Sequence, residues 1–109
     1  MSWDHVDVGM AGLVPQLFAA VKGAVASFSR SLARSVAPRV RVNILAPGWI
    51  ETAFGAGLDA ASRDAVVAAT PLARWGSPED VAAAAVFLAS PSAHFLTGQT
   101  LFVGGGAVM

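Results

Sequence analysis

The 109-residue sequence contains no cysteine and no tyrosine, and few of its residues are charged. Without cysteine, a disulfide scaffold, a thiolate nucleophile and a cysteine zinc site are all excluded. Seven Lys and Arg residues balance seven Asp and Glu residues, whereas nucleic-acid binders normally carry a clustered basic excess. The composition therefore predicts neither a disulfide framework nor a nucleic-acid partner.

Segments that would direct the chain to a membrane are also lacking. The first residues, Met1 to His5, have neither the basic stretch nor the apolar core of a signal peptide. Even the longest runs without a polar side chain, such as Val81 to Ala89, are much shorter than the roughly 18 residues of a membrane span. We expect a soluble, cytoplasmic chain with no membrane partner.

Apolar side chains are abundant for so short a chain. They make up 55% of the residues before glycine is counted, and charged residues make up only 13%. Typical soluble domains hold about 45–50% apolar residues with glycine included, and about 25% charged residues. A chain of this length hides only about 60–70% of its surface on folding. The surplus therefore predicts either a homo-oligomer or a piece of a larger fold.

Helical spacing of apolar residues alternates with short β-branched runs along the chain. The pattern predicts helices over residues 17–36, 58–69 and 81–89, and strands over 40–45 and 100–103. The run Ser77-Pro78-Glu79-Asp80 is a sharp helix start, because serine caps, proline suits the first turn and acids favour the positive helix end. The helix after it is nearly all apolar, so we expect both its faces to be covered.

This alternation indicates an α/β fold with parallel strand pairing. Only two convincing strands are present. A two-stranded sheet is marginal in water and would leave both edges open. The pattern therefore predicts an incomplete α/β layer.

Several short motifs follow one another along the chain. They are Lys22-Gly23-Ala24-Val25, Arg41-Val42-Asn43, Pro47-Gly48-Trp49-Ile50-Glu51-Thr52, Arg74-Trp75-Gly76-Ser77-Pro78-Glu79-Asp80-Val81-Ala82, Phe87-Leu88-Ala89-Ser90 and Thr97-Gly98-Gln99. Together they resemble the C-terminal part of the short-chain dehydrogenase/reductase family, in order and spacing, across essentially the whole chain. The resemblance implies a single partial Rossmann-like domain over residues 1–109: the C-terminal portion of a doubly wound parallel sheet, mostly helical, with about two short parallel strands. The family's dinucleotide-binding half would precede Met1, so we expect a truncated chain.

The resemblance also implies a reaction site, because the family performs NAD(P)-dependent ketone reduction or alcohol oxidation. Lys22 matches the lysine of the family's Tyr-x-x-x-Lys motif, which contacts the nicotinamide ribose and lowers the pKa of the tyrosine. Ser2 is the best match to the serine that polarises the substrate carbonyl. The loop that lines the nicotinamide and pyrophosphate is matched by Pro47, Gly48, Ile50 and Thr52.

Three departures from the family pattern impair this site. Phe18 occupies the tyrosine position, and phenylalanine can neither donate nor accept a proton. No glycine-rich turn for the pyrophosphate is present in the matching place, since the run from Gly104 to Gly106 follows the last strand. Gly104 also stands where the family usually has an aspartate. We expect no turnover by Ser2, Phe18 and Lys22 in this chain alone, and no complete NAD(P) site within it.

Two further interpretations of the whole chain stay open. In the resembled family, the long helix that carries Phe18 and Lys22 packs against its equivalent in another subunit. The chain can therefore be a non-catalytic module that forms homo-oligomers or binds a partner. It can also be the product of a truncated gene with no selected function. A small carbonyl or alcohol substrate would bind only where a complete site is formed.

Individual residues also have simpler interpretations. Lys22 fits a lysine that extends along an amphipathic helix, and Thr52 fits a cap for a helix after its loop. His5 and His94 lie far apart with no matching acid or cysteine pattern, so no metal site is predicted. The three tryptophans are predicted to be packing or interface anchors.

Overall fold

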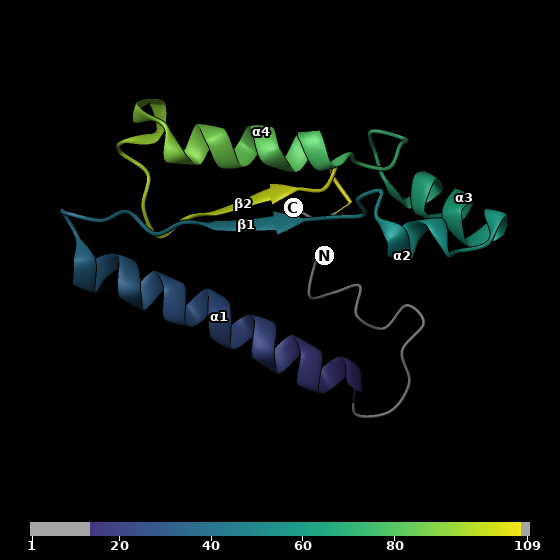
Figure 1. Ribbon diagram of the computed structural model, residues 1–109. Helices are drawn as coiled ribbons and strands as arrows, with labels where there is room; N and C mark the ends of the chain where they lie inside the picture. The colour runs from purple at the N-terminus through teal and green to yellow at the C-terminus, as the bar shows by residue number, and fades with distance from the viewer. Residues whose placement is uncertain (1–13, 108–109) are drawn as a thin grey trace.

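The computed structural model describes residues 14–107 (Figure 1). In chain order its elements are α1 (Val14–Val36), β1 (Ile44–Pro47), α2 (Ala53–Ala56), α3 (Ala60–Ala69), α4 (Pro78–Ala89), the short 3-10 helix η2 (Pro91–Ala93) and β2 (Thr100–Val103). Ser2, one of the expected site residues, lies outside the described residues. The order of helices and strands confirms the predicted α/β alternation.

The two strands form a parallel pair, as predicted. Ile44 lies opposite Thr100 and Pro47 lies opposite Val103. Within the described part of the chain the sheet has two strands. The predicted start of the first strand at residue 40 was wrong, because the chain there bonds to a loop instead of to β2. The Val42 amide donates to Thr97 Oγ1 at 3.1 Å, and the Gly98 amide donates to the Val42 carbonyl at 2.7 Å.

Helix α4 begins with the predicted cap. Ser77 Oγ accepts a hydrogen bond from the Asp80 amide at 3.2 Å, and Asp80 Oδ2 accepts one from the Ser77 amide at 2.8 Å. The helix then lies along one face of the sheet (Figure 1). The expectation that both its faces are covered was wrong: no α4 residue is buried, and Val86 is 69% exposed. Only the face toward the strands has a neighbour in residues 14–107.

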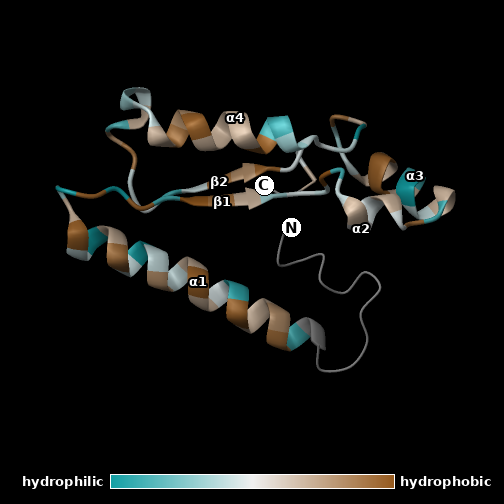
Figure 2. Ribbon diagram, viewed as in Figure 1, coloured by the Kyte–Doolittle hydropathy of each residue, from teal (hydrophilic) through white to brown (hydrophobic). Residues whose placement is uncertain are grey.

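Helix α1 lies on the other side of the sheet from α4 and touches the rest of the chain mainly near its C-terminal end (Figure 1). Ala33 is buried there, close to Gly98. The bulkier apolar side chains further up the helix are 52–66% exposed, and brown patches mark this helix in Figure 2. We call them the α1 stripe: Leu17, Val21, Val25 and Phe28. A sheet of two four-residue strands is too narrow to cover a helix of 23 residues.

The predicted helix over residues 58–69 forms two residues later, as α3, and a further short helix, α2, precedes it. Asp59 sets the start of α3, because its side chain accepts a hydrogen bond from the Ser62 amide at 2.7 Å. Across residues 14–107, no helix is long and apolar enough to cross a bilayer.

Candidate functional site

The chain leaves β1 through a tight contact with the end of β2. The Gly48 amide donates to the Val103 carbonyl at 2.9 Å. A Cβ atom at Gly48 would lie only 2.7 Å from the Gly104 Cα atom, which is too close for any side chain. Glycine is therefore required at position 48, and its amide joins the ends of both strands.

The loop after Gly48 is fixed by a second contact, with the chain that precedes α4. Ile50 and Gly76 form an isolated parallel bridge. The Gly76 amide donates to the Trp49 carbonyl, and the Glu51 amide donates to the Gly76 carbonyl, both at 2.8 Å. These bonds hold the loop at the carboxyl end of a parallel strand, which is where open α/β sheets bind ligands.

An apolar cavity of about 520 Å³ lies at this loop. It is lined by Pro47, Gly48, Trp49, Ile50, Thr52, Trp75, Pro78 and Val81. The four loop residues that the family resemblance singled out therefore line one cavity. Its walls are mostly carbon, and the only polar side-chain groups among the lining residues are the Thr52 hydroxyl and the indole N–H groups of Trp49 and Trp75. The cavity suits a flat, weakly polar ring more than a charged group.

Two tryptophans form much of the cavity wall. Trp49 and Trp75 meet edge to face, with ring centroids 5.7 Å apart. Trp75 is 8% exposed and lies against Gly55, where a Cβ atom would approach the Trp75 Cζ3 atom to 2.8 Å. The sequence predicted tryptophan packing but not its place in the site. The sequence did hold one signal for their place in the site: Trp49 follows Gly48 and Trp75 precedes Gly76, both within the matched motifs.

Phe18 and Lys22 lie together, but on α1 and away from this cavity. They are one helical turn apart, and Lys22 Nζ lies 5.5 Å from the centre of the Phe18 ring. Lys22 is exposed and Phe18 is half-buried. Neither residue lines the cavity at the β1 exit. The catalytic roles of Ser2, Phe18 and Lys22 therefore stay predictions.

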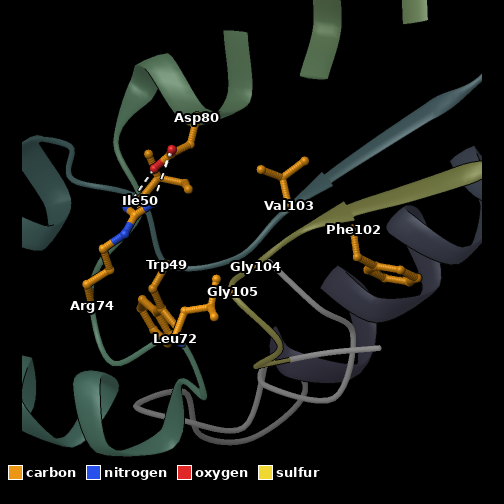
Figure 3. Close-up of a pocket in the computed structure, with 10 residues that line it drawn as sticks. Trp49, Ile50, Leu72, Arg74, Asp80, Phe102, Val103, Gly104 and Gly105 are labelled. Carbon is orange, nitrogen blue, oxygen red and sulfur yellow. Dashed lines mark hydrogen bonds and ion pairs between the residues drawn. The ribbon is translucent and has the colours of Figure 1, made fainter. Parts of the chain in front are cut away.

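A second, smaller cavity of about 230 Å³ shares Trp49 and Ile50 with the first and is shown in Figure 3. At its edge Arg74 Nη1 donates to Asp80 Oδ2 at 2.8 Å. The Arg74 side chain, with the Ser77 amide, holds the pKa of the Asp80 carboxyl well below its usual range. Asp80 therefore stays ionised as a helix cap and does not serve as a proton donor at neutral pH.

The donor set also limits what the site could hold. Within residues 14–107, no group of three or more His, Cys, Asp or Glu side chains could hold a metal ion. The apolar cavity has the chemistry to take the nicotinamide ring of a dinucleotide, and its candidate contacts are Pro47, Gly48, Ile50 and Thr52. The described residues contain no glycine-rich turn after a first strand for the pyrophosphate.

Comparison with known proteins gives consistent matches. A family model described as enoyl-(acyl carrier protein) reductase matches residues 3–108. The 3-oxoacyl-[acyl-carrier-protein] reductase of Vibrio cholerae is 46% identical over 104 residues, which are 94% of this chain and 43% of that protein. The Escherichia coli protein of the same name is 44% identical over 93 residues, covering 84% of this chain and 38% of that protein.

Solved structures agree with the sequence matches. A short-chain dehydrogenase/reductase from Brucella melitensis superposes with a TM-score of 0.82 and 39% identity, over 96% of this chain and 42% of that one. A 3-oxoacyl-[acyl-carrier protein] reductase from the same organism gives a TM-score of 0.80 and 42% identity, over 84% of this chain and 35% of that one. The chain thus spans less than half the length of these relatives. It belongs to the short-chain dehydrogenase/reductase family.

Proposed function

We propose that this chain holds the nicotinamide end of NAD(P) in the apolar cavity at the β1 exit, and that it does not reduce a ketone on its own. One observation carries the proposal. All four loop residues expected at a nicotinamide site line a single cavity, whereas Phe18 stands where the family resemblance expects the proton donor.

Each residue has a definite part in this site. The side chains of Pro47, Trp75 and Val81 give the cavity an apolar wall against which a ring can lie. The Thr52 hydroxyl can donate or accept one hydrogen bond to a carboxamide or phosphate. A bound nicotinamide would supply or accept a hydride. The residues that line this cavity include no carboxyl, imidazole or phenol that could supply the accompanying proton, and the Phe18 ring has no hydroxyl.

The names of the relatives suggest the carbonyl substrate of a complete site. Several act, by name, on 3-oxoacyl-[acyl-carrier-protein]. We propose a 3-oxoacyl thioester as the substrate class that a completed site would accept, in the cytoplasm. For this chain alone, we expect no ketone-dependent oxidation of NADPH or NADH.

The proposal is tested by titration with NADPH and with reduced nicotinamide mononucleotide. Trp49 and Trp75 line the cavity, so a Trp3→Phe background makes their fluorescence the only tryptophan signal. If only the nicotinamide end is held, both ligands should quench with similar affinities in the millimolar range. Thr52→Val should weaken both equally. Absence of quenching by either ligand would contradict the proposal, as would NADPH binding far more tightly than the mononucleotide.

A second function, self-association, is favoured by the α1 stripe. Four large apolar side chains on one helix are more than half exposed, which is typical of a surface that another protein covers. We propose a homodimer or larger assembly that buries the α1 stripe.

A further inference from the structure

The chain between the β1 exit and α3 has little regular structure of its own. Its only helix, α2, has four residues, and a single helical turn is unstable by itself in water. At its start the Glu51 amide donates to the Gly76 carbonyl, and beyond that its backbone hydrogen bonds are local: the amides of Ala56, Gly57 and Leu58 donate back to Thr52, Ala53 and Gly55 at 3.0, 3.3 and 3.2 Å. We call residues 51–57 the loop segment. It includes Thr52, which lines the apolar cavity.

Arg63, in the first turns of α3, binds the loop segment at two points. Its Nη1 atom donates to the Gly55 carbonyl at 2.7 Å, and its Nη2 atom forms an ion pair with the Glu51 carboxylate. The Arg63 side chain is 30% exposed and that of Glu51 is 44% exposed. One guanidinium thus ties the loop segment to α3 at two points, Glu51 and Gly55.

The same guanidinium stacks on the cavity wall. Its carbon lies 4.6 Å from the centre of the Trp75 ring, and Trp75 Nε1 donates to the Arg63 carbonyl at 3.3 Å. Gly55 lies against the same indole, with no room for a Cβ atom. The loop segment and the start of α3 therefore both contact the Trp75 ring, which is itself part of the cavity wall.

We propose that Arg63 and Trp75 are positioning residues that hold the loop segment closed beside the apolar cavity, so that the segment opens and closes as one unit when their contacts break. Arg63 does not line the cavity, and it acts through Glu51, Gly55 and Trp75. The inference rests on the proposed function for its ligand, because the cavity is the proposed nicotinamide site. The closed segment places Thr52 in the cavity wall, and an open segment removes it.

The chemistry requires arginine and glycine at these positions. A planar guanidinium can stack on an indole and donate in its own plane at the same time, whereas a lysine ammonium is a single point charge. Arg63→Lys should keep the ion pair with Glu51 but lose the combined contact. Gly55→Ala changes no charge, yet its methyl group would push the segment away from Trp75. Both should open the segment by different routes.

Hydrogen exchange in the ligand-free protein tests whether Arg63 and Trp75 hold the loop segment closed. We call these two residues and their contacts with the segment the clamp. In Arg63→Gln and Gly55→Ala, exchange at the amides of residues 56–58 should rise about tenfold or more, because these bonds open with the segment. Arg63→Lys should fall between these variants and the wild type. Acrylamide quenching of Trp75 should increase in parallel. Exchange in α4 should stay unchanged in all three.

Arg74→Gln is the matched control, since it removes an arginine ion pair next to Trp75 without touching the loop segment. It should leave exchange at residues 56–58 at the wild-type rate. The inference is overturned if Arg63→Gln and Gly55→Ala leave that rate unchanged. It is also overturned if they raise exchange equally in α4, which would indicate a general loss of stability.

Failure of the clamp and failure of the proposed function are distinguishable. Faster exchange in the variants, with no nucleotide binding by the wild type, would support the clamp and contradict the nicotinamide site. Nucleotide binding by the wild type, with unchanged exchange in the variants, would support the nicotinamide site and contradict the clamp. If both hold, Arg63→Gln should weaken binding of reduced nicotinamide mononucleotide several-fold while the urea midpoint of unfolding of the whole chain changes little.

Discussion

Gly48 and Gly104 face each other where the two strands end, but the structure gives them different tolerance for a side chain. A Cβ atom at Gly48 would meet the Gly104 Cα atom at 2.7 Å, whereas one at Gly104 would lie 3.5 Å from the nearest Gly48 atom. We expect Gly48→Ala to lower the free energy of unfolding by about 1–3 kcal/mol, because the backbone must move. Urea denaturation measures this change.

Gly104→Ala is the control and should change stability by less than about 1 kcal/mol, because its new contacts are ordinary van der Waals contacts. Equal losses in Gly48→Ala and Gly104→Ala would contradict the steric argument.

Asp80 should make stability depend on acid pH. Its pKa in the folded chain is lowered, first by the hydrogen bond from Arg74 and then by the Ser77 amide. The stabilisation is therefore fully present above the unfolded pKa of about 3.9, and it is lost as the pH falls toward the folded pKa. The urea midpoint of the wild type should fall between about pH 5 and about pH 2, and Asp80→Asn should flatten that fall.

The asparagine variant keeps an oxygen that can accept from the Ser77 amide, so it removes the charge while leaving much of the cap. Asp59, whose pKa is lowered by its bonds with Ser62, should produce a similar effect at the start of α3. If the wild type and Asp80→Asn lose stability in parallel, the ion pair with Arg74 has no role in acid unfolding.

At the residue scale, the sequence placed four residues together, and their roles toward a cofactor stay predictions. Pro47, Gly48, Ile50 and Thr52 line one cavity because a single motif places them directly after a strand. The role of Arg63 could not be found, because its contacts with Gly55 and Trp75 join positions 8 and 12 residues away. Such contacts depend on how α2 and α3 fold back, which no local pattern specifies.

Among the elements, the end of α4 depends on one side chain from before β1. Arg41 Nη2 donates to the Leu88 carbonyl at 2.8 Å, and Nη1 donates to the Leu96 carbonyl at 3.3 Å. Arg41→Met should cost about 1.5–3 kcal/mol, as expected when charged hydrogen bonds are lost. Arg41→Lys should recover part of this loss, since one ammonium cannot reach both carbonyls. Thermal unfolding gives the comparison.

Arg39→Met removes a neighbouring arginine that is exposed in the turn after α1, and it should have almost no effect. If it destabilises the chain as much as Arg41→Met, the result is explained by the loss of one positive charge and not by the loss of the hydrogen bonds to Leu88 and Leu96.

The elements themselves were largely predictable, but their surroundings were not. The cap from Ser77 to Asp80 fixes the start of α4, and the apolar run Thr100–Val103 forms β2 as expected. Apolar periodicity in α1 also predicted a helix correctly. It could not tell that the side chains of Val21, Val25 and Phe28 would be exposed, because periodicity indicates a face that needs a partner and not where that partner is.

For the whole molecule, the surplus of apolar side chains should appear as self-association. We expect light scattering at micromolar concentration to give a dimer or larger species. Val25→Glu, in the middle of the α1 stripe, should shift the mass toward the monomer because it would bury an unpaired charge.

Ser27→Glu adds the same charge to an exposed position of α1 outside the stripe, and it should leave the assembly intact. A wild-type chain that is monomeric at that concentration would contradict the proposed interface. Equal dissociation by both variants would indicate that net charge, and not the α1 stripe, controls the assembly.

The hydrogen bonds at the ends of β1 have a consequence for the misfolding of this chain. The Ile44 amide donates to the Gln99 carbonyl, just before β2, and the Gly48 amide donates to the Val103 carbonyl. Because successive residues of a strand point their backbone groups to opposite sides, those of Leu45 and Pro47 lie on the outer edge of β1. Proline has no amide hydrogen to offer there. A fibril that grew on the β1 edge would find four residues with one donor missing, whereas the β2 edge, Thr100–Val103, contains no proline. Growth by strand addition is therefore less favoured at β1 than at β2.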